Sequence, residues 1–221
     1  MKKICFLILF PLIFLFLFSG CKNTFSLTPY VSELKSQSYI ASAEGFKLKA
    51  YYGFKEEPYV NDGKVGQTVS RLTVKLIEFT GDNVTYSLEL FANGKDYKQD
   101  FKYNPVLDVL YLSFEIENFL EKSFTAVLSF ADVKINLSFE SELPENTKTY
   151  EEVTKILLKE QPTLINSLIS DGIFNAELHL RIIVKNSHPY WYVGIASESD
   201  RLKAFLVDGI SGEILAIREI F

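Results

Sequence analysis

The sequence predicts a mainly β protein, in which an antiparallel β-sandwich precedes a smaller unit made of a helix and antiparallel strands. The first observation is that apolar and polar residues alternate over most of residues 39–142, as in strands with one buried face. The second is that beyond Pro144 the apolar spacing changes to that of a helix and later returns to alternation. A chain of 221 residues is long enough to bury such cores.

The N-terminal segment has the pattern of an export signal. Lys2 and Lys3 precede an apolar run over residues 4–18, and the small residues Ser19 and Gly20 lead directly to Cys21. This segment resembles a bacterial lipoprotein signal. The resemblance implies that residues 1–20 are removed and that the Cys21 thiol carries a lipid. The alternatives are an ordinary secretory signal and an uncleaved anchor.

A lipid on Cys21 would hold the protein at the outer face of a membrane through acyl chains rather than a spanning helix. Residues 21–38 are polar and rich in Ser and Thr, so we expect a tether there. Cys5 is the one other cysteine and would leave with the signal, so no disulfide is expected. Without Lys2 and Lys3 the chain has 21 basic and 28 acidic residues and a net charge of −7, which argues against a nucleic-acid partner.

Residues 39–142 contain seven or eight short alternating segments separated by turn signals. Asn93-Gly94 is the strongest of these signals, because both residues tolerate the positive φ of a tight hairpin. Short strands at regular spacing are typical of a two-layered sandwich, here of immunoglobulin-like type without its Cys–Trp–Cys signature. The expected strands cover residues 46–52, 72–76, 86–90, 97–103, 110–116, 124–130 and 133–139.

The pattern changes between Glu142 and Thr149, where we predict a domain boundary. Thr149 and Glu152 form a capping box, in which each side chain accepts a hydrogen bond from the other residue's amide. Apolar residues then follow at helical spacing from Tyr150. Pro162 is expected to kink this helix or to begin a second one.

Residues 147–221 form the second predicted domain, with three or four strands after the helix. Its last hairpin contains Asp208, Ser211, Gly212 and Glu213, in which Asp208 can accept from the turn amides and Gly212 can supply a positive φ. This hairpin after a helix and antiparallel strands resembles the PepSY domain. The resemblance implies an extracytoplasmic binding role, such as protease modulation, and no chemistry. The whole chain resembles uncharacterised lipoproteins of Firmicutes.

The sequence contains no pattern that indicates catalysis, a metal or a cofactor. The two histidines, His179 and His188, lie in a strand and a turn, and without a free thiol in the mature chain a zinc site would need carboxylates as further ligands. No G-x-S-x-G elbow is present for a serine nucleophile. We therefore expect neither a catalytic residue nor a metal ligand.

Tyr190-Trp191-Tyr192 is the cluster of most interest. In a strand the two tyrosines share one face, and Trp191 lies on the other. If the tyrosines face the helix, Trp191 lies on the open face, where it either packs against the sandwich or contacts a glycan or protein. Residues 214–221 are apolar on both faces, so we expect them to meet the sandwich with Trp191 near the contact.

These observations favour a non-catalytic, lipid-anchored binding protein of the cell envelope, whose partner is an envelope protein or a glycan. The alternative is an extracytoplasmic hydrolase that acts on cell-wall or dietary polymers. A deep pocket with converging titratable groups would favour the hydrolase, and a shallow groove or exposed sheet edge would favour binding.

Overall fold

The computed structural model describes residues 25–60, 62–79, 84–119, 121–197 and 202–220. The predicted signal segment 1–20 and Cys21 lie outside these residues. The described chain is mainly β and dominated by antiparallel pairing, as the sequence predicts.

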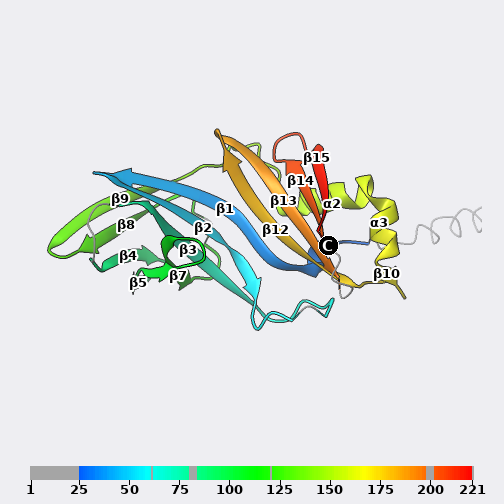
Figure 1. The fold of residues 1–221 in the computed structure, drawn as a ribbon, viewed down its shortest axis with the longest axis horizontal. Helices are drawn as coiled ribbons and strands as arrows, with labels where there is room; N and C mark the ends of the chain where they lie inside the picture. The colour runs from blue at the N-terminus through cyan, green and yellow to red at the C-terminus, as the bar shows by residue number, and fades with distance from the viewer. Residues whose placement is uncertain (1–24, 61, 80–83, 120, 198–201, 221) are drawn as a thin grey trace, which may run out of the picture.

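The strands fall into two groups that are separated along the chain by two helices (Figure 1). The elements before the helices are η1 (Thr28–Tyr30), β1 (Val31–Ala43), β2 (Phe46–Glu56), β3 (Thr68–Glu78), β4 (Tyr86–Ala92), β5 (Lys95–Asp100), β6 (Lys102–Asn104), β7 (Val109–Glu115), β8 (Ser123–Phe130) and β9 (Val133–Ser141). The remaining elements are α2 (Tyr150–Glu160), α3 (Pro162–Ser167), β10 (Ile169–Ser170), β11 (Ile173–Phe174), β12 (Ala176–Lys185), β13 (His188–Ser197), β14 (Leu202–Asp208) and β15 (Ile214–Ile220).

The long strand β1 joins both groups in one hydrogen-bonded sheet and runs between them through the middle of the molecule (Figure 1). Along the main path the strand order is β15-β14-β13-β12-β1-β2-β3-β7-β6. The far end of β1 also pairs with β9, which continues through β8 and β4 to β5. Among the described strands, β1 and β12 form the parallel pair and the other pairs are antiparallel.

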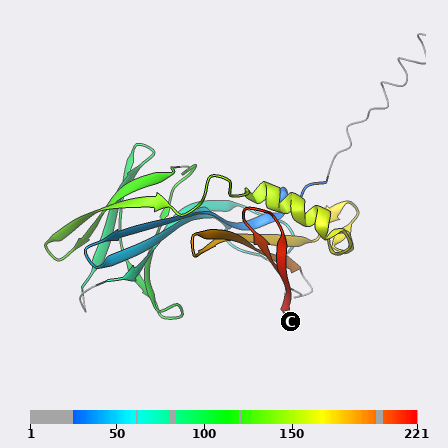
Figure 2. The ribbon, with the colours of Figure 1, turned by 90° about the horizontal axis from the view of Figure 1, so that it is seen from above.

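The first apolar core lies between two layers of strands (Figure 2). One layer contributes buried residues such as Leu72 and Val74, and the other contributes Leu128 and Leu137. These residues occupy alternate positions of their strands, so the period-two pattern identified the buried face correctly. The predicted hairpin at Asn93-Gly94 is also confirmed, because both residues have positive φ.

The second core lies between α2, α3 and one face of strands β12 to β14 (Figure 2). The predicted capping box is present: the Glu152 amide donates to Thr149 Oγ1 at 3.4 Å, and the Thr149 amide donates to Glu152 Oε2 at 2.8 Å. Pro162 begins the second short helix, α3, one of the two outcomes that the sequence predicts. Val153 and Leu157 of α2 are fully buried against the sheet.

Within the predicted tether 21–38, residues 25–38 are folded, so the prediction is wrong for this part. They form η1 and the first half of β1, and Leu27, Val31 and Leu34 are 1%, 3% and 4% exposed. The physical reason is that these three apolar residues, although separated by polar ones, pack into the second core. The polar composition of the segment concealed them.

The predicted boundary between Glu142 and Thr149 does not separate two independent sheets. The change from strand to helix does fall there, since β9 ends at Ser141 and α2 begins at Tyr150. However, β1 pairs with β9 and with β12, so the two units share one sheet. A strand of 13 residues extends about 43 Å, which is long enough to belong to both cores.

Candidate functional site

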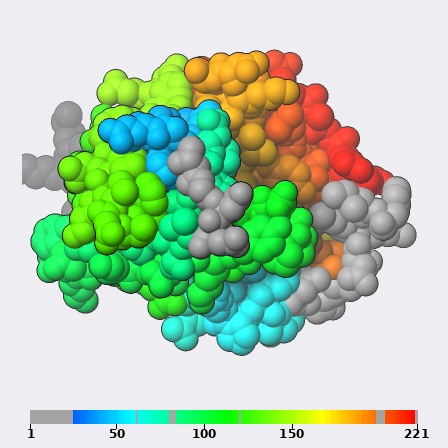
Figure 3. All heavy atoms as spheres, turned by 60° about the vertical axis from the view of Figure 1, so that its left-hand side comes forward, coloured from blue at the N-terminus to red at the C-terminus, as the bar shows by residue number. Residues whose placement is uncertain are grey.

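A groove crosses the face of the sheet that α2 and α3 leave open, at the junction of the two cores. Its volume is about 390 Å³, and β1, β2, β3, β7 and β12 contribute to it. In Figure 3 the β12–β13 hairpin (orange) and the β6–β7 turn (bright green) lie on either side of a recess in the surface. The lining residues are Glu33, Leu34, Lys35, Tyr51, Gly53, Phe54, Lys55, Val69, Arg71, Thr73, Tyr111, Ser113 and Arg181.

Strand register places the cationic residues in one row. Arg181 of β12 lies opposite Lys35 of β1, Lys35 lies opposite Gly53 of β2, and Gly53 lies opposite Arg71 of β3. Residues directly opposite one another project from the same face of a sheet. Apolar neighbours such as Leu34 and Leu180 project toward the second core instead, which leaves the polar row on the open face.

Gly53 lets β1 and β2 approach closely at the floor of the groove. A Cβ atom at this position would lie 1.8 Å from the Leu34 carbonyl oxygen, which is part of the backbone. The pairing of β1 with β2 is irregular between Lys35 and Gln37, next to this point. A glycine is therefore required here for steric reasons, and it leaves bare backbone between the charged side chains.

Three carboxylates in and around the groove are held by cations. Glu33 Oε1 lies 3.3 Å from Lys35 Nζ, and Glu33 Oε2 accepts a hydrogen bond from Arg181 at 3.0 Å. Burial alone would raise the pKa of Glu33, but the charges of Arg181 and Lys35 hold it below its usual value. Arg71 donates to both oxygens of Glu57 and also to Glu115 at 2.9 Å.

The site carries a surplus of positive charge. Lys55 and Lys75 form no ion pair with a described residue, and their ammonium groups instead lie 5.9 Å and 5.7 Å from the ring centroids of Tyr59 and Tyr51. Burial lowers the pKa of Lys75, and the charges of Lys35 and Arg181 lower it further. Lys35, Arg71 and Arg181 are therefore paired with Glu33, Glu57 and Glu115, whereas Lys55 and Lys75 add two positive charges without an ion pair, within a chain that is acidic overall.

Trp191 does not lie on the open face, so the predicted orientation is wrong. It is 1% exposed in the second core, beneath the helices, and its Nε1 donates a hydrogen bond to the Lys148 carbonyl at 2.9 Å. The predicted contact with the sandwich is also wrong, because β15 is the edge strand farthest from it in the sheet order. Leu215 and Ile217 of β15 are 45% and 53% exposed.

Tyr190 and Tyr192 occupy the open face instead, and both are half-buried. Tyr192 lies opposite Arg181, so it extends the row of groove residues onto β13. The Tyr190 ring lies 4.8 Å from the ring of His188, measured between centroids. The two tyrosines are therefore the members of this cluster that a ligand on the open face can reach.

The hairpin motif from Asp208 to Glu213 forms the turn that the sequence predicts, and its side chains stabilise that turn. Asp208 Oδ1 accepts from the amides of Ile210 and Ser211, both at 2.8 Å, and Gly212 has a φ of +82°. The hydrogen bond from the Ser211 amide is the largest effect on the pKa of Asp208, and it lowers that pKa. Burial opposes it, the Ile210 amide adds to it, and the resulting pKa is about 2. The Glu213 amide donates to Ser211 Oγ at 3.2 Å, which completes the turn.

The described residues offer neither a metal-binding cluster nor a membrane-spanning helix. They contain no group of three or more His, Cys, Asp or Glu side chains in a geometry that could hold a metal ion. They also contain no helix that is long and apolar enough to cross a membrane.

Comparisons with known proteins identify no relative. No protein-family model, no curated protein and no solved structure matches the chain. The site must therefore be interpreted from its own chemistry.

Proposed function

We propose that this protein is a non-catalytic binding protein of the cell envelope, anchored by a lipid on Cys21, whose groove docks an anionic ligand. The observation that carries the proposal is the surplus of positive charge over a shallow groove lined by Tyr51, Tyr111 and the hydroxyl groups of Thr73 and Ser113. Cations attract carboxylate or phosphate groups, and tyrosines with hydroxyl side chains suit a sugar. An acidic oligosaccharide fits this chemistry.

The strand order supports an immunoglobulin-like first unit. One layer has the order β2-β3-β7-β6 and the other has β5-β4-β8-β9, which corresponds to the A-B-E-D and C′-C-F-G order of immunoglobulin-like sandwiches. On this proposal β1 is an added strand that pairs with the first and last strands of the sandwich. A PepSY-like second unit remains a proposal that rests on the hairpin from Asp208 to Glu213.

We favour binding over the alternative, an extracytoplasmic hydrolase. A general acid needs a carboxyl group that remains protonated near neutral pH. The buried carboxylate at the groove, Glu33, instead has its pKa held below the usual value by the charges of Arg181 and Lys35, which favours the ionised form. Glu57 and Glu115 are engaged in ion pairs with Arg71.

Replacement of Cys21 by Ala is expected to release the protein from membranes. The lipid would be attached to the thiol of Cys21, so the variant has nothing to receive it. Fractionation of cells that express the wild type or C21A, followed by mass measurement, tests this. A variant that stays in the membrane fraction with the mass of residues 1–20 included would contradict the anchor.

Removal of the unpaired charges is expected to weaken anionic ligands about tenfold. We choose the double variant Lys55→Gln and Lys75→Gln, because neither lysine holds a carboxylate that would be left unpaired. Each such charge contributes about 0.7 kcal/mol at a partly exposed site, and the resulting total of about 1.4 kcal/mol corresponds to a factor of ten. Calorimetric titration with an oligogalacturonate, with polyphosphate and with a neutral galactose oligomer measures the effect.

Lys98→Gln serves as the control, because Lys98 is on β5, away from the groove, and pairs with Glu89. Its affinity should equal that of the wild type. A preference for the oligogalacturonate would identify an acidic glycan, and a preference for polyphosphate would identify a phosphate polymer. Equal binding of the neutral and charged oligomers, or no loss in the double variant, would exclude the charged groove as the docking surface.

A further inference from the structure

The buried side-chain atoms that lack a hydrogen-bond partner gather in one place. Among the described residues there are five such atoms, and they belong to Ser32, Glu56, Glu177 and His179. Buried polar groups in proteins nearly always have a partner, so each exception requires an explanation. Five exceptions in one cluster point to a single missing group rather than to scattered irregularities.

Three neighbouring strands bring the cluster together. Glu177 and His179 project from the same face of β12, and His179 lies opposite Glu33 of β1. Ser32 lies at the irregular step in this pairing, between Val31 and Glu33. Glu56 is the last residue of β2 and follows Lys55, which lies opposite Glu33 from the other side.

Three of these side chains are sealed from solvent, and His179 is half-buried with a buried Nε2 atom. Glu177 and Ser32 are 0% exposed and Glu56 is 3% exposed. Glu56 Oε2 lacks a hydrogen-bond partner, and both oxygens of Glu177 and the Ser32 Oγ lack a partner of good geometry. The protein therefore compensates the burial of these two carboxylates only in part, through the Gly66 amide at Glu56 and through Ser32 and the Gly63 amide near Glu177. An uncompensated buried carboxylate costs several kcal/mol or becomes protonated.

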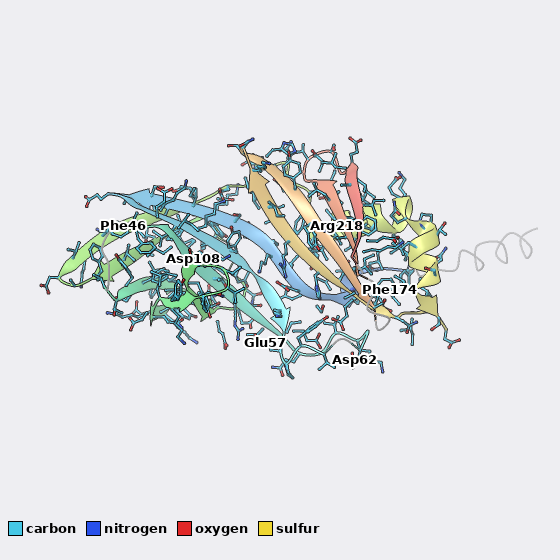
Figure 4. All side chains as sticks on the ribbon, in the orientation of Figure 1. Phe46, Glu57, Asp62, Asp108, Phe174 and Arg218 are labelled. Atoms are coloured by element: carbon cyan, nitrogen blue, oxygen red, sulfur yellow. The ribbon has the colours of Figure 1, made fainter. Side chains whose placement is uncertain are left out.

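The segment 57–67 covers the cluster. The Gly66 amide donates to Glu56 Oε1 at 2.7 Å, and the Tyr59 ring lies 5.5 Å from the His179 ring between centroids. Gly63 packs against the backbone of Asn175 and Ala176 at the start of β12. Figure 4 shows Glu57 and Asp62 on this segment, which extends from the end of β2 toward Phe174.

This cover can open at small cost. Of its described residues, Gly63 is the buried one, Glu57 and Val65 are half-buried, and the others are exposed. Segments that bury little apolar surface open with low free energies. A small ligand can therefore enter without unfolding either core.

The unpartnered atoms share one chemical property: all can accept a hydrogen bond. The carboxylate oxygens accept when ionised, the Ser32 oxygen can accept, and the neutral imidazole of His179 accepts through Nε2 in one tautomer. Burial lowers the pKa of His179, which favours this neutral form. Burial also raises the pKa of Glu177; the Ser32 hydroxyl opposes this effect, and the charges of Glu56 and Asp62 add to it.

The cations on the strands around the cluster are already engaged. Arg181 and Lys35 are engaged with Glu33, and the Lys55 ammonium lies over the Tyr59 ring. What the cluster lacks is a positive charge that brings several donors. A metal ion would supply the charge, but Glu56, Glu177 and His179 are not in a metal-holding geometry. A primary ammonium group supplies the charge together with three N–H donors.

We propose that Ser32, Glu56, Glu177 and His179 form a binding site for the primary ammonium group of a small ligand, which enters beneath segment 57–67. The site is separate from the anionic docking groove and does not depend on it. The two sites have opposite charge requirements and share Glu33 at their border, because Glu33 lies opposite His179 and also lines the groove.

Methylammonium chloride tests the proposal against tetramethylammonium chloride, which has the same charge but no N–H donor. Methylammonium is expected to raise the melting temperature of the full chain by several degrees at equal ionic strength, and tetramethylammonium is not. Amide NMR shifts on addition of methylammonium should fall in residues 56–67 and 175–179.

Glu177→Gln is the informative variant, and it is expected to fold because it removes a buried negative charge. It should lose the methylammonium effect, as should Ser32→Ala in part. Glu145→Gln, which changes an exposed carboxylate outside both the cluster and the groove, should keep the full effect. Equal effects of methylammonium and tetramethylammonium would overturn the proposal. Stabilisation by calcium or zinc chloride alone would also overturn it and would indicate a metal site. If no cation has an effect, the proposal is wrong and a shared proton explains the buried carboxylates.

Discussion

Trp191→Ala is expected to destabilise the protein by about 3–5 kcal/mol, as truncation of a large buried aromatic residue does. The side chain is 1% exposed and packs in the second core with residues such as Val153, Leu157 and Val207. Its indole N–H also donates to the Lys148 carbonyl, so it ties the segment before α2 to the sheet. Truncation removes both the packing and this link, and it leaves the carbonyl without its donor.

Thermal and chemical denaturation measure this loss. In a chain of this size, about 1 kcal/mol corresponds to a shift of roughly 2–4 °C in melting temperature. Trp191→Phe keeps much of the volume and loses the hydrogen bond, so a smaller loss of about 1–3 kcal/mol is expected. Tyr192→Ala, on the open face, should cost less than Trp191→Ala. A Trp191→Ala variant that melts with the wild type would show that the indole is not part of the core.

Local patterns in the sequence predicted the features that depend on local physics. Alternation identified the buried residues of strands such as β3 because a strand has one buried face wherever it lies in the sheet. The capping box at Thr149 and the hairpin at Asn93-Gly94 were predictable for the same reason, since each depends on a few consecutive residues. The hairpin at Asp208 belongs to this class too.

The errors concern relations between distant segments. β1 pairs with β12 in parallel, which brings Lys35 beside Arg181, 146 positions along the chain, and no local pattern specifies this pairing. Residues 31–38 are part of the strand that makes this pairing, whereas their polar composition had predicted a tether. Both the groove and the buried cluster depend on it, so neither could be found from residue spacing alone.

Trp191 shows a second limit. Alternation separates the two faces of a strand, but it does not say which face a helix will cover. In β13 the face that contains Trp191, Val193 and Ile195 is covered by the helices, and the face that contains Tyr190 and Tyr192 is open. The opposite assignment, with the tyrosines facing the helix, fits the sequence equally well.

Gly53→Ala is expected to cost about 3 kcal/mol or more, at or above the upper end of the range for overpacking. The added Cβ would lie 1.8 Å from the oxygen and 2.6 Å from the carbon of the Leu34 carbonyl. Neither atom can move alone, because Leu34 is in β1 and lies opposite both Phe54 of β2 and Leu180 of β12. The strain therefore falls on the strand that joins the two cores.

Gly94→Ala is the matched control for Gly53→Ala. Gly94 has a φ of +75° and no atom within 4 Å of the added Cβ, so its substitution strains the backbone without a clash. That strain costs about 1–2 kcal/mol. Denaturation of both variants should therefore show a larger loss for Gly53→Ala, and hydrogen exchange should show reduced protection in both β2 and β12. If Gly53→Ala lowers the free energy of unfolding no more than Gly94→Ala does, β1 and β2 are farther apart at the groove floor than in the structure. The alignment of Arg181, Lys35, Gly53 and Arg71 in one row would then be wrong.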